Sequence, residues 1–261
     1  RIENTEGTNI RNLTLKNGDG DSGGALYVKD TDMGIESVAF SANISSDGGA
    51  IRIERSDYRN DDTVRIINSI FDGNSSGGER GGAVTSIRGN VQFTNTEFKN
   101  SQVAADGEIG KGGHIYALGG NINIEDADFH GNPLGIFGTA AFGTYGGMLF
   151  IDHDSERQAR GDDRGADHNV FNGNQQNSTG ADPVTNGGAV WVRESTNFIN
   201  CNFVNNIAEF GGAIYVGTTE DGFPVDVTFI NCTIANNVAL GLGGGIYVEQ
   251  TAGQGVTLIN S

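Results

Sequence analysis

Short apolar segments recur along the chain, and each one follows a pair of glycines. Eight copies start at Gly23, Gly48, Gly81, Gly112, Gly146, Gly187, Gly211 and Gly243, at intervals of 24 to 41 residues. Within a copy the fourth and sixth positions are mostly aliphatic, whereas the fifth varies, as in GGALYV and GGAVWV. Side chains alternate between the faces of a β-strand, so we expect positions four and six to face a core and position five to point outward.

A second motif, an apolar residue followed three positions later by Asn, alternates with the first. It occurs at Phe40/Asn43, Phe71/Asn74, Phe129/Asn132, Phe171/Asn174, Phe203/Asn206 and Ile234/Asn237. Another apolar segment precedes each copy, as in TVRIINSIF and NVQFTNTEF. A fixed motif at unequal spacing is typical of a solenoid whose loops vary in length. We therefore predict an all-β chain, a single parallel β-helix (solenoid) of about eight rungs over residues 1–261.

The glycines and asparagines of these motifs are expected to serve the coil. Glycine adopts positive φ at sharp corners and lets neighbouring rungs approach closely. Asparagine tolerates the left-handed region, and its amide bonds well along a stack of identical residues. One predicted Asn ladder comprises Asn12, Asn68, Asn95, Asn200, Asn231 and Asn260.

The combination of Gly-Gly-Ala-(Ile/Leu/Val) with Phe-x-x-Asn resembles the repeat of the chlamydial polymorphic outer-membrane proteins and related bacterial surface β-helices. That resemblance implies a right-handed, single-stranded β-helix related to the pectate-lyase-like superfamily, and a secreted, cell-surface setting. Members of such families are mostly passengers, adhesins or stalks, so the resemblance implies little chemistry. Because the sequence starts and stops inside the repeat, we also expect it to be a fragment of a longer chain.

Charge narrows the range of partners. The formal net charge is −17, from 33 acidic against 16 basic side chains. Such a chain repels phosphate backbones, which argues against nucleic-acid binding, and it is disfavoured at anionic membranes for the same reason. No apolar run approaches the roughly 20 residues that cross a bilayer, so no membrane span is predicted in this segment.

The fifth position of the Gly-Gly motif is a candidate binding surface. It holds aromatic residues in five successive copies, namely Tyr116, Phe150, Trp191, Tyr215 and Tyr247. If this column is exposed, it offers a stripe for another surface protein, a copy of the same chain or the rings of a glycan. The alternative is an inter-rung ladder that stabilises neighbouring turns.

The longest interval between Gly-Gly copies contains an acidic stretch, predicted to be a protruding loop at residues 152–169. Its carboxylates at Asp152, Asp154, Asp162 and Asp163 are candidate calcium ligands, since Ca²⁺ takes oxygen donors. A solvated charged loop and the paired carboxylates of a polysaccharide-active enzyme are the alternatives. Gly161-Asp162-Asp163 resembles one element of the polygalacturonase site, but the other elements are absent, and we assign no catalytic residue.

Cys201 and Cys232 occupy the same position in INCNF and INCTI, in a column that we align with Val38, Ser69, Thr96, Ala127 and Asn169. Stacked neighbours about 4.8 Å apart are close enough for a disulfide. Two buried thiols acting as small apolar fillers are the alternative. His114 and His130 have no partner evident in the sequence and are expected at the surface or in turns.

These observations favour a non-enzymatic, extracellular scaffold: an adhesin, stalk or fibre subunit without a cofactor, calcium being the exception left open. A polysaccharide lyase or hydrolase, or a carbohydrate-binding module, on the same fold is the alternative function.

Overall fold

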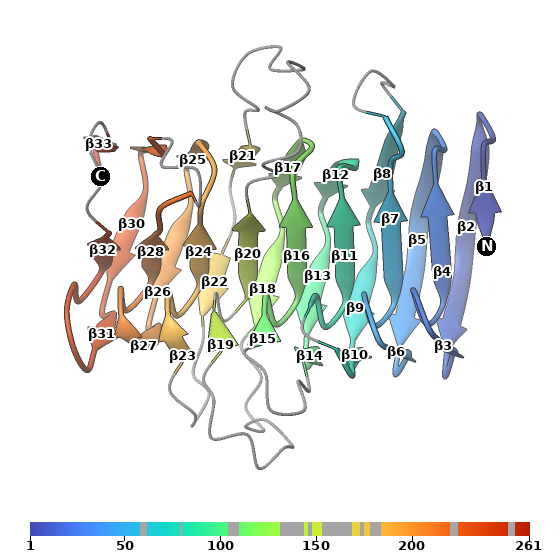
Figure 1. The fold of residues 1–261 in the computed structure, drawn as a ribbon, viewed down its shortest axis with the longest axis horizontal. Helices are drawn as coiled ribbons and strands as arrows, with labels where there is room; N and C mark the ends of the chain where they lie inside the picture. Colours follow the sequence, from blue (N-terminus) through green and yellow to red (C-terminus); the bar gives the residue numbers. More distant parts are fainter. Residues whose placement is uncertain are drawn as a thin grey trace.

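The computed structural model describes residues 1–57, 62–78, 80–103, 110–130, 144–145, 148–152, 169–172, 175–177, 184–219, 224–249 and 254–261. Within these residues all regular elements are β-strands, and paired strands run parallel (Figure 1). The chain is thus a parallel β-solenoid, as predicted. None of the described residues forms a helix that could span a bilayer.

The strands that follow the Gly-Gly pairs form one sheet of nine strands, which we call the Gly-Gly sheet. It holds one strand more than the eight Gly-Gly copies because β1 precedes the first copy, so the predicted count of about eight rungs differs slightly. Its members are β1 (Ile2–Glu3), β4 (Leu26–Lys29), β7 (Ile51–Glu54), β11 (Val84–Ile87), β16 (Ile115–Leu118), β20 (Leu149–Asp152), β24 (Val190–Val192), β28 (Ile214–Val216) and β32 (Ile246–Val248).

A sheet of 15 strands, the long sheet, forms two further faces of the coil. β2 and β5 run through both faces, six later turns are divided at the corner into two shorter strands, and the last described turn contributes β33 alone. The members are β2 (Thr8–Lys16), β5 (Met33–Ser41), β8 (Thr63–Ile67), β9 (Ile70–Asp72), β12 (Asn90–Thr94), β13 (Glu97–Lys99), β17 (Ile122–Glu125), β18 (Asp128–His130), β21 (Asn169–Asn172), β22 (Gln175–Asn177), β25 (Thr196–Ile199), β26 (Asn202–Val204), β29 (Asp226–Ile230), β30 (Thr233–Ala235) and β33 (Gly255–Ile259).

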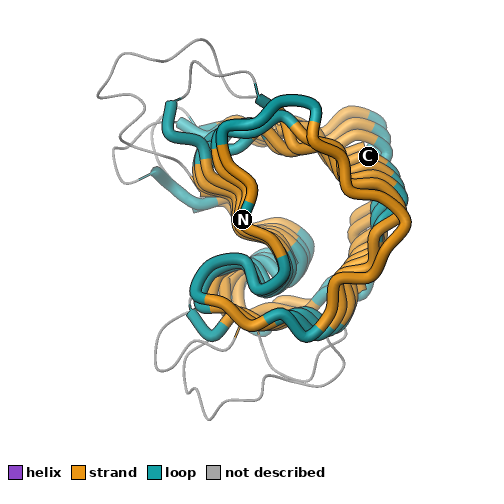
Figure 2. Tube along the Cα trace, turned by 90° about the vertical axis from the view of Figure 1, so that its right-hand side faces the viewer, coloured by secondary structure: helices purple, strands orange, loops and turns teal. Residues whose placement is uncertain are grey.

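Two narrow sheets close each turn just before the Gly-Gly pair. The first contains β3 (Asp19–Gly20), β6 (Ile44–Ser45), β10 (Ser75–Ser76) and β14 (Gln102–Val103). The second contains β15 (Gly110–Lys111), β19 (Thr144–Tyr145), β23 (Val184–Asn186), β27 (Ile207–Phe210) and β31 (Val238–Ala239). Seen along its axis, the coil is not a convex ring, because the chain bends inward on one side, where its N-terminus lies (Figure 2).

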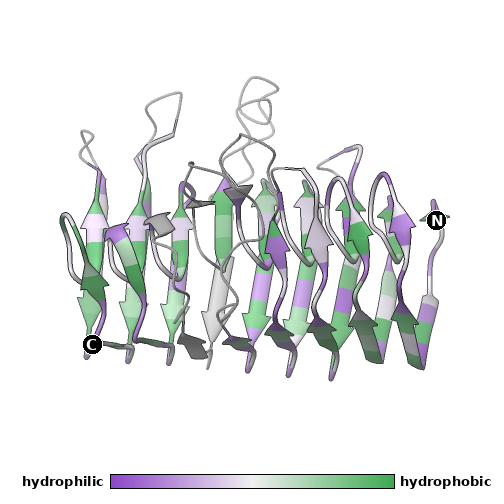
Figure 3. Cartoon of the chain, turned by 90° about the horizontal axis from the view of Figure 1, so that it is seen from below, coloured by the Kyte–Doolittle hydropathy of each residue, from purple (hydrophilic) through white to green (hydrophobic). Residues whose placement is uncertain are grey.

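Alternation along the strands assigns the core as predicted. Motif positions four and six of the Gly-Gly sheet, such as Ile51, Ile53 and Val190, are almost wholly buried, and hydrophobic and hydrophilic positions alternate along many strands (Figure 3). The phenylalanines of the Phe-x-x-Asn motif stack face to face inside, together with Phe98, which occupies the same column although its Asn follows after two positions. Ring centroids lie 4.7 Å apart for Phe40 and Phe71, and 4.8 Å apart for both Phe71 and Phe98 and Phe98 and Phe129. This spacing is the distance between neighbouring parallel strands.

The two glycines of each pair have different reasons for being glycine. The first has positive φ, for example +68° at Gly48. The second lies against the same glycine of the next turn, and a Cβ on Gly49 would be 2.1 Å from the carbonyl oxygen of Gly82. Any side chain there would separate the turns, so the close stacking expected from the motif is confirmed.

Asparagine also has two separate roles. Members of the predicted ladder, including Asn68 and Asn95, stand at corners with φ of +50° and +48°. They also bond along the axis as predicted, since Asn95 Nδ2 donates to Asn68 Oδ1 at 2.7 Å. The Asn of the Phe-x-x-Asn motif is buried: Asn43 Nδ2 donates to Asn74 Oδ1 at 2.9 Å, and Asn74 Nδ2 donates to the Phe40 carbonyl at 3.0 Å. The amides thereby satisfy backbone groups that the corner leaves unpaired.

The sequence alignment of one turn was wrong. Phe171 pairs with Ile124 and Phe198, in the upstream column, while Gln176 lies between Phe129 and Phe203. Likewise Asn169 pairs with Thr196 and is not in the cysteine column. The interval between the two inward columns is five residues in each neighbouring turn, as from Phe198 to Phe203. The strand register places Phe171 and Gln176 at the same interval, with Phe171 at the earlier position.

Candidate functional site

The fifth motif positions form a continuous column outside the main core, which we call the outer column. It runs through Tyr27, Arg52, Thr85, Tyr116, Phe150, Trp191, Tyr215 and Tyr247, which the strand register places side by side. The rings contact one another along the axis. Centroids are 5.5 Å apart for Tyr116 and Phe150, 4.5 Å for Phe150 and Trp191, 5.6 Å for Trp191 and Tyr215, and 5.0 Å for Tyr215 and Tyr247.

The exposure that a binding stripe requires is absent at three of the five aromatic candidates. Tyr116, Phe150 and Tyr215 are 2%, 0% and 8% exposed, whereas Trp191 and Tyr247 are half-buried. The column does face away from the main core, but onto the concave side of the coil seen in Figure 2. The arrangement corresponds to the inter-rung ladder that the sequence left open as the alternative.

The residues just before the Gly-Gly pairs cover the rings of the following turn. The Arg80 guanidinium lies 5.2 Å from the centroid of Tyr116, and the Lys111 ammonium lies 5.8 Å from that of Phe150. Farther along, the Phe210 ring packs 5.7 Å from that of Tyr247. Cations over aromatic faces are attracted by the ring quadrupole. Arg80 and Lys111 therefore stabilise the rings that they cover.

Asp152, the one calcium candidate within the described residues, is engaged by neighbours of the outer column. Its Oδ2 accepts a hydrogen bond from the Tyr116 hydroxyl at 3.1 Å, and its Oδ1 lies 3.1 Å from Arg193 Nη1. Arg193 Nε donates in turn to the Thr218 carbonyl at 2.9 Å. Burial, and then the negative charge of Asp152, raise the pKa of Tyr116, which stays a neutral donor.

The other predicted ligands, Asp154, Asp162 and Asp163, lie outside the described residues, as does nearly all of the loop 152–169. Within the described part of the chain, no three His, Cys, Asp or Glu side chains gather as a metal site would require. Asp152 itself has an ion-pair partner and a hydrogen-bond donor. Its geometry is that of a structural ion pair.

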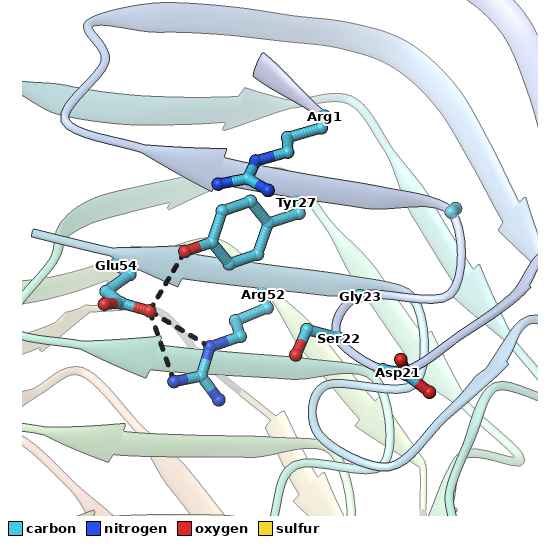
Figure 4. Close-up of a pocket in the computed structure, with 8 residues that line it drawn as sticks. Arg1, Asp21, Ser22, Gly23, Tyr27, Arg52 and Glu54 are labelled. Atoms are coloured by element: carbon cyan, nitrogen blue, oxygen red, sulfur yellow. Dashed lines mark hydrogen bonds and ion pairs between the residues drawn. The ribbon is translucent and has the colours of Figure 1, made fainter. Parts of the chain in front are cut away.

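The outer column opens into a cavity of about 530 Å³ in the first turns (Figure 4). Tyr27 and Arg52 line it from the Gly-Gly sheet, and Asp21 and Ser22 line it from the bend just before Gly23. Sequence reasoning missed this cavity, although a signal existed: Ser22 is small, whereas Arg80, Lys111 and Phe210 occupy the equivalent place in later turns.

Tyr27, Arg52 and Glu54 are joined to one another in this cavity. Glu54 Oε2 accepts from the Tyr27 hydroxyl at 3.2 Å and lies 3.3 Å from Arg52 Nη2 (Figure 4). Arg52 also pairs with Asp47. Burial, followed by the charge of Glu54, raises the pKa of Tyr27. A glycosidase needs one carboxylic acid that donates a proton and a second carboxylate that acts as a base or nucleophile. Glu54 is already the ion-pair partner of Arg52, so it does not fit either role.

His114 is buried, contrary to the surface position expected for it, whereas His130 is exposed. The His114 ring stands where most copies have Ala and packs 6.0 Å and 6.1 Å from the rings of Phe98 and Phe129. Its Nε2 lies 2.8 Å from the His130 carbonyl oxygen, so the neutral ring donates there. Burial lowers the pKa of His114 to about 4, outweighing that hydrogen bond.

Exposed apolar side chains gather near the last turns. Ile207 and Val238 pair across β27 and β31, and Leu240 and Leu242 follow in the same segment, with exposures between 37% and 68%. Clustered apolar surface of this kind is typical of contact sites.

One comparison with known proteins gave a match. The repeat of the Chlamydia polymorphic membrane protein family matches residues 231–249, from the corner at Asn231 through β30 and β31 to the end of β32. Neither the curated proteins nor the solved structures gave a match. The matched stretch contains one copy of each of the two motifs, and it agrees with the resemblance seen in the sequence.

Proposed function

We propose that this chain is a non-enzymatic, extracellular segment of a bacterial surface protein, and that its solenoid acts as a rigid scaffold for adhesion or self-assembly. One observation carries the proposal: the Gly-Gly sheet continues in register through nine strands, with backbone bonds between all turns along the axis. A rod of this kind displays its edges and loops at fixed spacing. The match to a surface-protein repeat supports the setting.

The contacts made by the candidate residues favour a scaffold over an enzyme. Asp152 is paired with Arg193, and most of the outer column is buried in a ladder between turns. These side chains stabilise the coil, and we assign none of them to catalysis.

The surface setting is tested on intact cells that make the full protein. Brief protease treatment should release peptides of this segment before any cytoplasmic marker appears, because a surface rod is accessible from outside. Release only after lysis would contradict the proposal.

Self-assembly is tested with the purified chain. The exposed side chains of Leu240 and Leu242 are the best candidates for a contact, since they are 68% and 59% exposed. Sedimentation should show association that weakens in a Leu240→Ser/Leu242→Ser variant but not in Ile44→Ser, which changes an exposed apolar residue far from this patch. A monodisperse monomer at all concentrations would leave adhesion to other molecules as the function.

The alternative, a polysaccharide-active enzyme or glycan-binding module, is checked by adding anionic polysaccharides. A lyase would generate unsaturated products that absorb in the ultraviolet. Such turnover, lost in Asp162→Ala/Asp163→Ala, would overturn the scaffold proposal. For glycan binding, Trp191→Ala is the informative change, because Trp191 is one of the half-buried members of the outer column.

Calcium binding by the loop 152–169 stays a prediction. If Asp154, Asp162 and Asp163 bind the ion, adding Ca²⁺ should raise Tm, and Asp162→Asn/Asp163→Asn should abolish the rise. No change in Tm on chelation would argue against a structural ion.

A further inference from the structure

Cys201 and Cys232 lie side by side in adjacent turns of the coil. β26 and β30 pair with Asn202 opposite Thr233, and the Thr233 N–H donates to the Cys201 carbonyl at 2.9 Å. Neither residue is in a disulfide, and the two are 0% and 5% exposed. The predicted shared column is thus confirmed for these two residues.

This column normally holds a small side chain that closes a corner. The γ atoms of Ser69, Cys201 and Ser261 each donate to the carbonyl two residues earlier, at 2.9, 3.3 and 3.1 Å. The intervening corner residues, such as Asn68 and Asn200, have positive φ. A serine would therefore fill the local role of either cysteine, and the corner alone does not account for two cysteines in adjacent turns.

The Cys232 side chain is directed toward the turn that carries Cys201. Cys232 Sγ lies 3.3 Å from the Phe198 carbonyl, which belongs to the turn of Cys201, so this side chain leans toward its neighbour. Hydrogen bonding with the Cys201 side chain is the main cause that lowers the pKa of Cys232 to about 7. A larger thiolate fraction makes Cys232 a more reactive nucleophile than an ordinary cysteine.

We propose that Cys201 and Cys232 are a cross-linking site, which a small-molecule disulfide oxidant converts into a disulfide between neighbouring turns. The Cys232 thiolate attacks one sulfur of the oxidant and releases a first thiol. The Cys201 thiol then loses its proton, attacks Sγ of Cys232 and releases the second. Two protein thiols and one oxidant disulfide thus become one protein disulfide and two small thiols. The site is independent of the scaffold function, although an extracellular setting would keep it oxidised.

Parallel neighbours are spaced suitably for this bond. Strands in a sheet lie about 4.8 Å apart, within the Cα separation that disulfides span. The bond would close a loop between residues 201 and 232 and restrict the unfolded chain, so a rise in Tm of roughly 5 to 10 °C is expected.

The test refolds the purified chain from urea with excess oxidised glutathione, so that burial does not limit access to the thiols. The product is then denatured and treated with iodoacetamide, which alkylates any remaining thiol, and the chain should take up no alkyl group. Its mass should be about 2 Da below that of the reduced chain, and peptide mapping should recover a linked Cys201–Cys232 pair. The Tm rise should disappear on adding dithiothreitol.

Cys201→Ser and Cys232→Ser are the matched controls, because serine retains the corner hydrogen bond. Each should fold with the strand content of the parent, and neither should show the dithiothreitol-sensitive rise in Tm. Two alkylated cysteines in the refolded parent, or disulfides only between separate chains, would overturn the proposal.

Discussion

The hydroxyl of Tyr116 donates a hydrogen bond to the carboxylate of Asp152 in the next turn, with 3.1 Å between Oη and Oδ2. The same carboxylate faces Arg193 from the turn beyond, so three successive turns are joined outside the main core. Asp152 is the first residue of the acidic stretch that the sequence marked for calcium. In the folded chain its carboxylate balances the charge of Arg193.

Replacing Asp152 with Asn should lower the free energy of unfolding by about 2 to 4 kcal/mol, because the largely buried charge of Arg193 would lose the carboxylate that it faces. Urea unfolding measures the loss. The control is Glu36→Gln, which breaks the exposed Arg11–Glu36 pair and should cost at most about 1 kcal/mol. Equal losses in the two variants would contradict a structural role for the buried pair.

Gly49→Ala should destabilise the coil by about 3 kcal/mol or more, since its Cβ would lie 2.1 Å from the Gly82 carbonyl oxygen and 2.6 Å from that of Ser75. Both contacts are backbone atoms that cannot rotate away. Gly77→Ala is the matched control, because its nearest atom would be 3.8 Å away. Thermal unfolding should separate the two variants clearly, and similar Tm values would refute the close-stacking explanation.

Asn74→Ala should cost about 2 to 4 kcal/mol, because it removes the side-chain oxygen that accepts from the Asn43 backbone N–H and amide, and the amide that donates to the Phe40 carbonyl. Asn121→Ala removes an exposed amide that bonds to Asn90 at 3.2 Å, and it should change stability by less than about 0.5 kcal/mol. Denaturant unfolding of both variants provides the comparison. A neutral Asn74→Ala would mean that the ladder contributes nothing.

His114 should make the coil less stable in mild acid. Its folded pKa of about 4 lies below the ordinary value of 6.5, so between these values the unfolded chain binds a proton that the folded chain does not. The free energy of unfolding contributed by this group is therefore unaffected above pH 6.5. It falls as pH drops toward 4, by a total on the order of 3 kcal/mol.

Urea unfolding at pH 7.5 and 4.5 tests this, with the pH dependence of His114→Ala subtracted from that of the parent. The variant restores the residue that most Gly-Gly copies carry at this position. His130→Gln, at an exposed residue, should retain the parent's pH dependence. If His114→Ala retains it as well, the buried ring is not the cause.

The sequence by itself determined the coil. Side chains alternate with a period of two residues, and a short motif repeated in each turn stacks on itself, so Leu26, Ile51 and Val84 had to share one inward column. The glycine pairs and corner asparagines likewise belong to local geometry that any turn must satisfy. The error at Phe171 arose because two inward columns accept the same aromatic residue, and only the strand register distinguished them.

Tertiary structure alone decided what happens outside the core. Alternation predicted that Tyr116 and Phe150 point away from it, but not that the coil bends inward there and brings Arg80 and Lys111 over their rings. The pairing of Asp152 with Arg193 depends on the neighbouring turn, 41 residues farther along the chain. Outward direction is a property of one strand, whereas exposure depends on every segment packed against it, and a repeat pattern describes only the first.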